Sequence, residues 1–265
     1  MVSSSWDAEQ ILRAGMAAER SNLDFFLVTD HYLTQHGNKT TDAWTVLSAL
    51  AIKTKKICIG TCVSPIPLRP PTILAKVVST VDIISGGRTI LGVGAGWYKP
   101  EFTAYSSWDD DNIRVSKTIE GVRLILKLWT EQEPFDFQGK FYKVEGAVLE
   151  PKPIRRPHPP LWFGVLGQRM LRAAASYAEA WVPPVPGISL HEYRHVISSL
   201  RKFQQEIRRD RPVKVYFNGT FEEIVKNIEA FKEVGCEGAI LARTPFEKVI
   251  SSMKMLARDV VPSYR

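Results

Sequence analysis

The sequence predicts an α/β fold, a single (β/α)8 TIM barrel, on the basis of three observations. Apolar segments typical of buried strands alternate with amphipathic helical segments along the whole chain. The strand segments are continuous apolar runs, which is typical of a parallel sheet covered by helices. The pattern gives seven strands and eight helices, which fits a (β/α)8 barrel better than a Rossmann sheet. Because no strand precedes the first helix, we expect that the natural chain starts earlier or that the barrel lacks its first strand.

In the first half of the chain, caps and prolines mark the helix ends. Asp7 stands in the first turn of an amphipathic pattern, where its charge matches the positive end of the helix dipole. Asp42 caps the second pattern, and the third follows Pro71 and stops at Gly86. Helices are therefore expected at residues 7–21, 41–52, 72–84 and 112–129, and strands at residues 24–29, 56–63 and 89–93.

The second half repeats the same units after an excursion at about residues 130–158, in which aromatic residues alternate. Thr220 and Glu223 have the spacing of a capping box at the start of a helix. Strands are expected at residues 160–165, 180–183, 213–217 and 238–242, and helices at residues 168–177, 191–209, 221–234 and 246–258. No linker divides the chain, so we expect one barrel domain over residues 1–265.

Composition and charge argue against several classes of protein. The chain has 265 residues, 45% hydrophobic and 24% charged, as in an ordinary soluble globular protein. The net charge of +7 is spread over helix ends and turns rather than one basic patch, which argues against nucleic-acid binding. No apolar run approaches the ~20 residues of a membrane span, and the start lacks a secretory signal, so we expect a cytoplasmic protein. Cys58, Cys62 and Cys236 form no CxxC pair, so neither a metal site nor a disulfide framework is expected.

The segment 88–105, RTILGVGAGWYKPEFTAY, combines a buried strand with an unusual end. Gly94 and Gly96 have no Cβ, so a flat ring or a phosphate can lie against the main chain there. The alternative is that glycine serves only a sharp turn. Two other strands also end in unusual residues, at Asp30-His31 and at Cys62-Val63. Because the active sites of barrels lie at the carboxyl ends of their strands, we expect these ends and Ala95-Gly96 to form one site.

Three stretches together resemble the bacterial luciferase-like superfamily of flavin and deazaflavin oxidoreductases. They are residues 28–31 (VTDH), 56–63 (KICIGTCV) and 92–105 (GVGAGWYKPEFTAY). Further similarity extends over residues 128–129, 141–142, 151–153 and 161–174, so the resemblance covers nearly all of residues 6–262. The strand-end Asp-His and the Gly-x-Gly-Trp loop look most similar to members that use the deazaflavin coenzyme F420. Members that use FMN with oxygen are close neighbours.

The resemblance implies roles for the residues at the strand ends. His31 becomes the catalytic candidate, because histidine holds or releases a proton near neutral pH, although an isolated histidine is more often structural. Asp30 would orient this imidazole or contact the cofactor, or it would serve only as a cap. A non-proline cis peptide near Cys62-Val63 would form a bulge that supports the ring system. The remaining cofactor-binding candidates are Ala95, Gly96, and Leu166, Gly167 and Gln168, whose main-chain N–H groups precede a helix and could hold a phosphate.

Some positions depart from the pattern of the sugar-phosphate dehydrogenases in this superfamily. Trp97 stands where they carry a glutamate after the Gly-x-Gly, and Gln35 stands where they carry a tryptophan after the Asp-His. The oxidation of glucose 6-phosphate is therefore disfavoured. Four aromatic residues follow the Gly-x-Gly: Trp97, Tyr98, Phe102 and Tyr105. They suggest either an apolar wall for the substrate or core packing beneath the loop.

The leading hypothesis is an oxidoreductase that moves a hydride between F420 and a small organic substrate, with His31 as the polar partner. One alternative is an FMN-dependent monooxygenase that uses molecular oxygen. Another is a flavin-binding protein without catalysis, similar to the non-fluorescent flavoprotein of luminous bacteria. The resemblance also implies a homodimer that buries the early helices around Trp44 and residues 73–81, although the same faces would suit ordinary packing of helices on the barrel.

Overall fold

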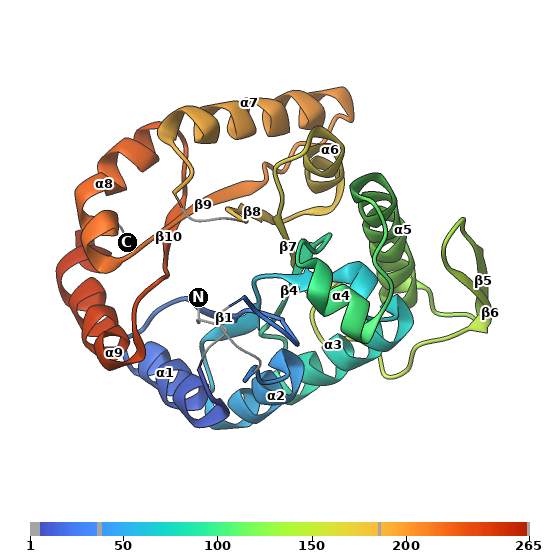
Figure 1. Ribbon diagram of the computed structural model, residues 1–265, viewed down its shortest axis with the longest axis horizontal. Helices are drawn as coiled ribbons and strands as arrows, with labels where there is room; N and C mark the ends of the chain where they lie inside the picture. Colours follow the sequence, from blue (N-terminus) through green and yellow to red (C-terminus); the bar gives the residue numbers. More distant parts are fainter. Residues whose placement is uncertain (1–5, 36–38, 185–186, 264–265) are drawn as a thin grey trace.

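A parallel sheet curls through the centre of the protein in a computed structural model that describes residues 6–35, 39–184 and 187–263 (Figure 1). The strands run in the order β1-β2-β4-β7-β8-β9-β10, and the short β3 also pairs with β4. Their bounds are β1 (Phe25–Val28), β2 (Cys58–Thr61), β3 (Ser64–Pro65), β4 (Thr89–Gly94), β7 (Leu161–Gly164), β8 (Ala180–Val182), β9 (Lys214–Gly219) and β10 (Gly238–Leu241). Each predicted strand therefore corresponds to a strand of this sheet.

Helices surround the sheet in a ring (Figure 1). They are α1 (Ala8–Arg20), α2 (Ala43–Lys53), α3 (Pro71–Ser85), α4 (Lys99–Tyr105), α5 (Asp111–Thr130), α6 (Gln168–Tyr177), α7 (Leu190–Glu206), α8 (Phe221–Glu233) and α9 (Phe246–Met255). The predicted cap at Asp42 is confirmed, because its Oδ1 accepts from Thr45 N–H at 2.8 Å. Asp7, expected in the first turn, is instead the N-cap of α1, and its Oδ1 accepts from Gln10 N–H at 2.8 Å. Gly86 ends α3 in the left-handed region, at φ 72°.

The excursion is an antiparallel hairpin of β5 (Phe135–Gln138) and β6 (Lys143–Ala147), which projects beyond the helix ring (Figure 1). Glu120 of α5 holds its turn, because its carboxylate accepts from the N–H groups of Lys140, Phe141 and Tyr142 at 2.7–3.0 Å. The hairpin is thus anchored to α5 and stands apart from the barrel strands.

Aromatic rings fill the amino-terminal end of the barrel. Phe25 opens β1, Trp162 lies at the start of β7, and Tyr216 lies beside the first residue of β10. The ring centroids of Phe25 and Trp162 are 4.9 Å apart, and those of Trp162 and Tyr216 are 4.8 Å apart. With this end closed by packed rings, the carboxyl ends of the strands are the side from which a ligand can enter.

The sheet is open along one seam. Among the described residues, β1 forms a ladder with β2 alone and β10 with β9 alone, so the two outermost strands do not pair. Outside the seam, α1 packs against α9. The opening lies beside β1, where the sequence predicts a missing first strand. In the described part of the chain, no helix has both the length and the apolar character needed to cross a membrane.

Candidate active site at the carboxyl ends of the strands

The predicted site residues all follow neighbouring strands. Asp30 and His31 follow β1, Cys62 and Val63 connect β2 to β3, Ala95 and Gly96 follow β4, and Leu166, Gly167 and Gln168 follow β7. Since β1, β2, β4 and β7 are consecutive in a parallel sheet, their carboxyl ends lie at one rim. The fold therefore brings all nine residues to the same end of the barrel.

Val63 projects toward β4 and β7 from a bulge between β2 and β3. The Cys62–Val63 peptide bond is cis, as the resemblance implies. A Cβ atom at Gly94 would lie 2.5 Å from Val63 Cγ2, and one at Gly164 would lie 2.9 Å from Val63 Cγ1. Glycine on these two strands thus makes room for the Val63 side chain, which remains partly exposed.

The space beside Gly94 and Gly96, where a ligand was expected to approach the main chain, is filled by other side chains of the protein. Val63 occupies the space at Gly94, and the Phe102 ring occupies the space where a Cβ of Gly96 would lie. Gly96 also has φ 77°, a conformation that other residues rarely adopt. Packing and turn geometry therefore account for both glycines without a bound ring or phosphate.

His31 is held by a buried carboxylate that the sequence analysis missed. Glu101 is 1% exposed, and its Oε2 lies 3.0 Å from His31 Nδ1. Its Oε1 accepts from the backbone N–H of Tyr32 at 2.6 Å and of Leu33 at 3.2 Å. A carboxylate oxygen accepts hydrogen bonds, so Nδ1 carries the hydrogen and Nε2 is the ring nitrogen that Glu101 does not engage. The imidazole, 19% exposed, is thus fixed in tautomer and orientation.

Glu101 lies in the first turn of α4, a seven-residue helix that was not predicted. The family pattern draws attention to the position directly after the Gly-x-Gly, where this chain has Trp97. The carboxylate near His31 belongs instead to Glu101, four positions after Trp97. An acid one helical turn after that loop is the signal that could have found it.

Asp30 has its own partners. Its carboxylate, 2% exposed, accepts from Ser64 Oγ at 2.6 Å and from Arg69 Nη2 at 2.7 Å. Arg69 also pairs with Asp42 at 2.6 Å, which ties the end of β1 to the start of α2. Burial alone would lower the pKa of Arg69, but the two carboxylates raise it overall. Glu101, and not Asp30, therefore orients the imidazole, and Asp30 anchors the rim.

The start of α6 is open. Gly167 is its N-cap residue. Among the described residues, no side chain caps the helix, and nothing lies within 4 Å of the place where a Cβ of Gly167 would stand. Two arginines of α6 that could add positive charge here have other partners: Arg169 donates to Ser116 Oγ at 2.7 Å, and Arg172 to Glu206 at 2.6 Å. The first N–H groups of α6 therefore have the geometry of a helix start, to which anions such as phosphate are attracted in general.

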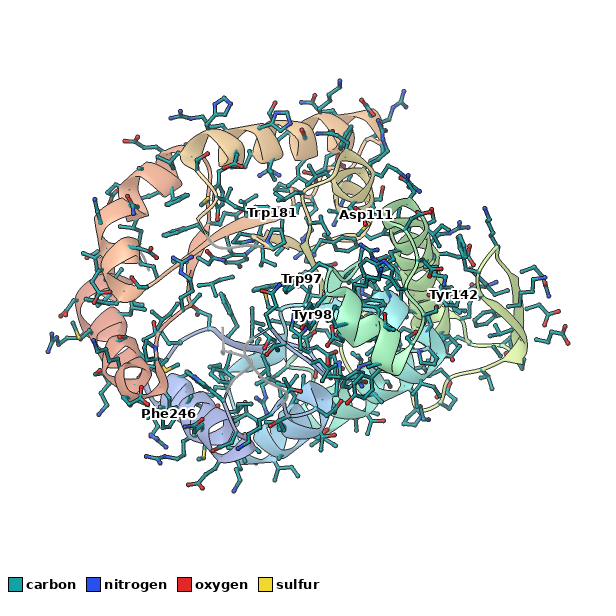
Figure 2. All side chains as sticks on the ribbon, viewed as in Figure 1. Trp97, Tyr98, Asp111, Tyr142, Trp181 and Phe246 are labelled. Carbon is teal, nitrogen blue, oxygen red and sulfur yellow. The ribbon has the colours of Figure 1, made fainter. Side chains whose placement is uncertain are left out.

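The four aromatic residues after β4 divide between the site and the core. Trp97 is 59% exposed and stands edge-on to His31, with ring centroids 6.1 Å apart. Trp97 and Tyr98 lie toward the middle of the helix ring (Figure 2). Phe102 is fully buried and packs against Trp108. The substrate-wall interpretation therefore suits Trp97, and the core interpretation suits Phe102.

Comparison with known proteins decides the family. A model of the luciferase-like monooxygenase family matches residues 2–235. The chain belongs to this family. Luciferase-like relatives include an FMNH2-dependent dimethylsulfone monooxygenase of Pseudomonas putida, 32% identical over 179 residues, which are 67% of this chain and 48% of the relative. Another is an F420-dependent glucose-6-phosphate dehydrogenase of Microbacterium testaceum, 28% identical over 68% of this chain and 54% of the relative.

The chain spans about half the length of these curated relatives. A solved structure of an F420-dependent secondary alcohol dehydrogenase with an F420-acetone adduct has a similar fold. Its TM-score is 0.85 at 20% identity, over 98% of this chain and 96% of that one. The luciferase-like fold is therefore shown, and the family contains both F420- and FMN-dependent oxidoreductases.

The rim residues fit a flavin-type cofactor in their chemistry. Val63 offers a partly exposed apolar surface for a flat ring, and the open start of α6 offers backbone donors for a phosphate. Burial raises the pKa of the Cys62 thiol to about 11, so this side chain is a neutral neighbour for such a ring at physiological pH.

Proposed function

We propose that this protein is an F420-dependent oxidoreductase that transfers a hydride between the cofactor and a small organic substrate. The observation that carries the proposal is the fixed imidazole of His31, held by buried Glu101 beside the exposed ring of Trp97. Such an arrangement places a proton-transfer group next to an apolar surface, as a reaction that changes the charge on a substrate oxygen requires. The similarity to F420-dependent relatives supports it.

When bound, F420 supplies a carbon that accepts or donates a hydride. The residues of the chain bind, orient and exchange a proton. Val63 and Cys62 would support the ring system, Ala95 and Gly96 would border it, and the backbone of Leu166, Gly167 and Gln168 would hold the phosphate. His31 Nε2 takes a proton from a substrate hydroxyl or returns one to a carbonyl oxygen, while Glu101 keeps the imidazole in place. Asp30 acts through Arg69, by fixing the end of β1.

The substrate class follows from the wall beside His31. Trp97 and Tyr98 present aromatic surface, with ring centroids 5.4 Å apart, and no carboxylate follows the Gly-x-Gly directly. An apolar alcohol or ketone suits this surface better than a sugar phosphate.

A second candidate is an FMN-dependent monooxygenase. The 32% identity to the FMNH2-dependent dimethylsulfone monooxygenase favours it, because this relative is more similar than the F420-dependent one. The same rim would hold the FMN ring and phosphate. The two candidates differ in cofactor and in the need for oxygen.

We also propose a homodimer in the cytoplasm. The outward faces of α2 and α3 carry Ile52, 66% exposed, and Ile73, 60% exposed, which suits a contact between two copies. Trp44 does not belong to that face, because it is 1% exposed and donates to Ser64 Oγ within the same chain. The three cysteines are free thiols, which suits a reducing compartment.

A fluorescence titration with F420 and with FMN tests the cofactor assignment. We expect F420 to bind at least about tenfold more tightly than FMN, a difference of ~1.4 kcal/mol. Gly167→Asp should weaken F420 binding at least about tenfold, because its carboxylate caps α6 and repels the phosphate, while the melting temperature stays equal or rises. Gly167→Ala is the matched control, since φ −66° at this position suits alanine.

Three results would change the proposal. Tighter binding of FMN would favour the monooxygenase, and binding of neither would favour a protein that has lost the site. Unchanged affinity in Gly167→Asp would show that the phosphate lies elsewhere.

A further inference from the structure

Two buried hydroxyl groups flank the bulge that carries Val63. Thr61 is the last residue of β2 and Ser64 is the first of β3, and both are 0% exposed. Cys62 and Val63, which lie between them, are partly exposed at the rim. The hydroxyl oxygens of Thr61 and Ser64 are 3.1 Å apart, so a hydrogen bond closes the base of the bulge.

The Ser64 hydroxyl has three hydrogen-bond partners but only one hydrogen. Its oxygen lies 2.6 Å from Asp30 Oδ2, 3.1 Å from Trp44 Nε1 and 3.1 Å from Thr61 Oγ1. The carboxylate of Asp30, which pairs with Arg69, can only accept, so it takes the serine hydrogen. The indole N–H of Trp44 and the Thr61 hydroxyl are then the donors to Ser64 Oγ. Ser64 therefore uses its one hydrogen and both of its lone pairs.

The same hydrogen bonds form a chain from β4 to the end of β1. The backbone N–H of Gly92 donates to Thr61 Oγ1 at 3.1 Å. Thr61 then donates to Ser64, and Ser64 donates to Asp30. A Cβ at Gly92 would clash with the carbonyl oxygen of Thr61, so glycine allows the two strands to approach this closely. Every bond of the chain points toward a charged acceptor, and bonds in such a chain strengthen one another. Removal of one hydroxyl thus weakens the hold on both sides of the bulge.

We propose that Ser64 is a positioning residue, whose hydroxyl fixes the bulge and thereby the place of Val63 against the cofactor ring. This inference rests on the proposed function, in which Val63 supports the ring. Gly94 and Gly164 make room for the Val63 side chain but present no side chain of their own to hold it. The position of Val63 therefore depends on the main chain on either side of it. Ser64 is the residue that ties this main chain to the end of β1 and to α2.

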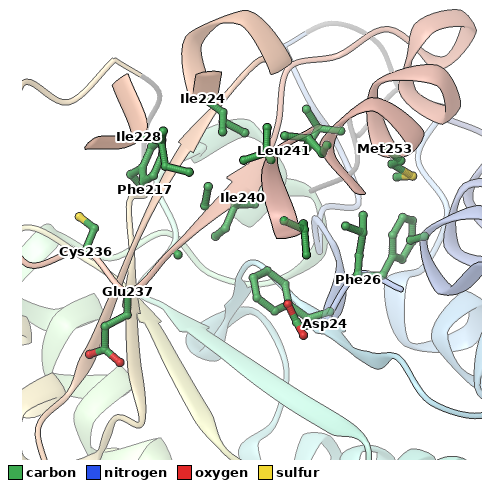
Figure 3. Close-up of a pocket in the computed structure, with 18 of the residues that line it drawn as sticks. Asp24, Phe26, Phe217, Ile224, Ile228, Cys236, Glu237, Ile240, Leu241 and Met253 are labelled. Carbon is green, nitrogen blue, oxygen red and sulfur yellow. The ribbon is translucent and has the colours of Figure 1, made fainter. Parts of the chain in front are cut away.

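The test compares Ser64→Ala with Cys236→Ala, each made in the full 265-residue chain, because each substitution removes one buried side-chain atom. Cys236 lines the apolar cavity drawn in Figure 3 and precedes β10, so it lies at the opposite end of the strands from the bulge. Both variants should have a lower melting temperature. We expect Ser64→Ala alone to weaken binding of F420, or of FMN if the protein binds that cofactor instead, at least about tenfold. The visible circular dichroism of the bound cofactor, which reports the surroundings of its ring, should also change in Ser64→Ala alone.

A second variant and a measurement without cofactor examine the chain of hydrogen bonds itself. Thr61→Val keeps the shape of the side chain and removes the hydroxyl on the other side of the bulge, so it should weaken cofactor binding at least about threefold. In the protein without cofactor, the NMR resonance of the Trp44 indole N–H should move upfield in Ser64→Ala, because this N–H loses its acceptor.

The possible failures can be told apart. Equal losses of cofactor affinity in Ser64→Ala and Cys236→Ala would overturn the inference, and so would unchanged affinity in Thr61→Val. If the indole resonance shifts while the affinity and the dichroism stay as in the unmodified protein, the hydrogen bonds hold only the fold; the inference is then wrong although the proposed function stands. If the unmodified protein binds neither F420 nor FMN, the proposed function and this inference both fail.

Discussion

Glu101→Gln is expected to lower kcat about 100-fold while F420 binding stays within about threefold of the unmodified protein. Residues that orient a metal-bound histidine through its second nitrogen typically contribute 10- to 100-fold, and the same scale is expected for His31. Glutamine is close in size, so the buried position remains filled. However, its amide offers one acceptor oxygen in place of two, while His31, Tyr32 and Leu33 all donate to Glu101. The imidazole then loses its fixed orientation.

A loss of kcat without a loss of cofactor affinity would distinguish a residue that positions His31 from one whose substitution damages the whole structure. Glu247→Gln is the matched control, because Glu247 is also an acid in the first turn of a helix after a barrel strand but is exposed. We expect the control to keep full activity. If Glu101→Gln lowers the melting temperature and the cofactor affinity together with kcat, Glu101 has a structural role and not a positioning one.

Arg69→Met is expected to have the largest effect on stability, a loss of about 3–5 kcal/mol. The reason is the carboxylate that the substitution leaves behind. Asp30 is 2% exposed, and without the guanidinium Ser64 Oγ is its one remaining side-chain donor among the described residues. Methionine also removes the cation over the Tyr32 ring, which lies 4.7 Å from the ring centroid. Urea unfolding measures the loss, and Arg172→Met, whose side chain is 55% exposed beside Glu206, is the control with little change.

The same substitution should change how stability depends on pH. Burial raises the pKa of Asp42, but its hydrogen bonds to Arg69 and Thr45 lower it overall. A carboxyl group with a lowered pKa adds stability above its unfolded-state pKa, and this contribution is lost as the pH falls through the folded-state value. Arg69→Met should therefore show a weaker loss of stability on acidification. If Arg69→Met loses as much stability on acidification as the unmodified protein, Arg69 does not cause the lowered pKa of Asp42.

Local signals made most of the fold predictable from sequence. The side chains of three residues each accept a hydrogen bond from the backbone N–H three positions later, at the start of a helix; they are Asp7, Asp42 and Thr220. Gly86 ends α3 through its own left-handed backbone conformation. The seven strands were found because each is a short apolar run between such signals. Helix α4 was missed because it has seven residues, no side-chain cap and only two buried positions.

Interactions across long stretches of sequence account for what could not be predicted at the site. Glu101 and His31 are 70 positions apart, and the acid one helical turn after the Gly-x-Gly loop does not by itself indicate His31 as its partner. The sequence left Gly94 open between a ligand approach and a sharp turn, because its partner, Val63, is brought beside it only by the pairing of β3 with β4. The sequence left two roles open for Asp30, because its partner Arg69 lies 39 positions away and is not indicated by the local sequence. The strand-end positions were predictable; their hydrogen-bond partners were not.

Hydride transfer is tested most directly by following F420 with a panel of small apolar alcohols and ketones, both in air and without oxygen. We expect one cofactor molecule to be oxidised or reduced for each product molecule formed, at the same rate in both atmospheres, and His31→Ala to abolish the reaction. Product that forms only in the presence of oxygen and reduced FMN would contradict hydride transfer and identify the protein as a monooxygenase.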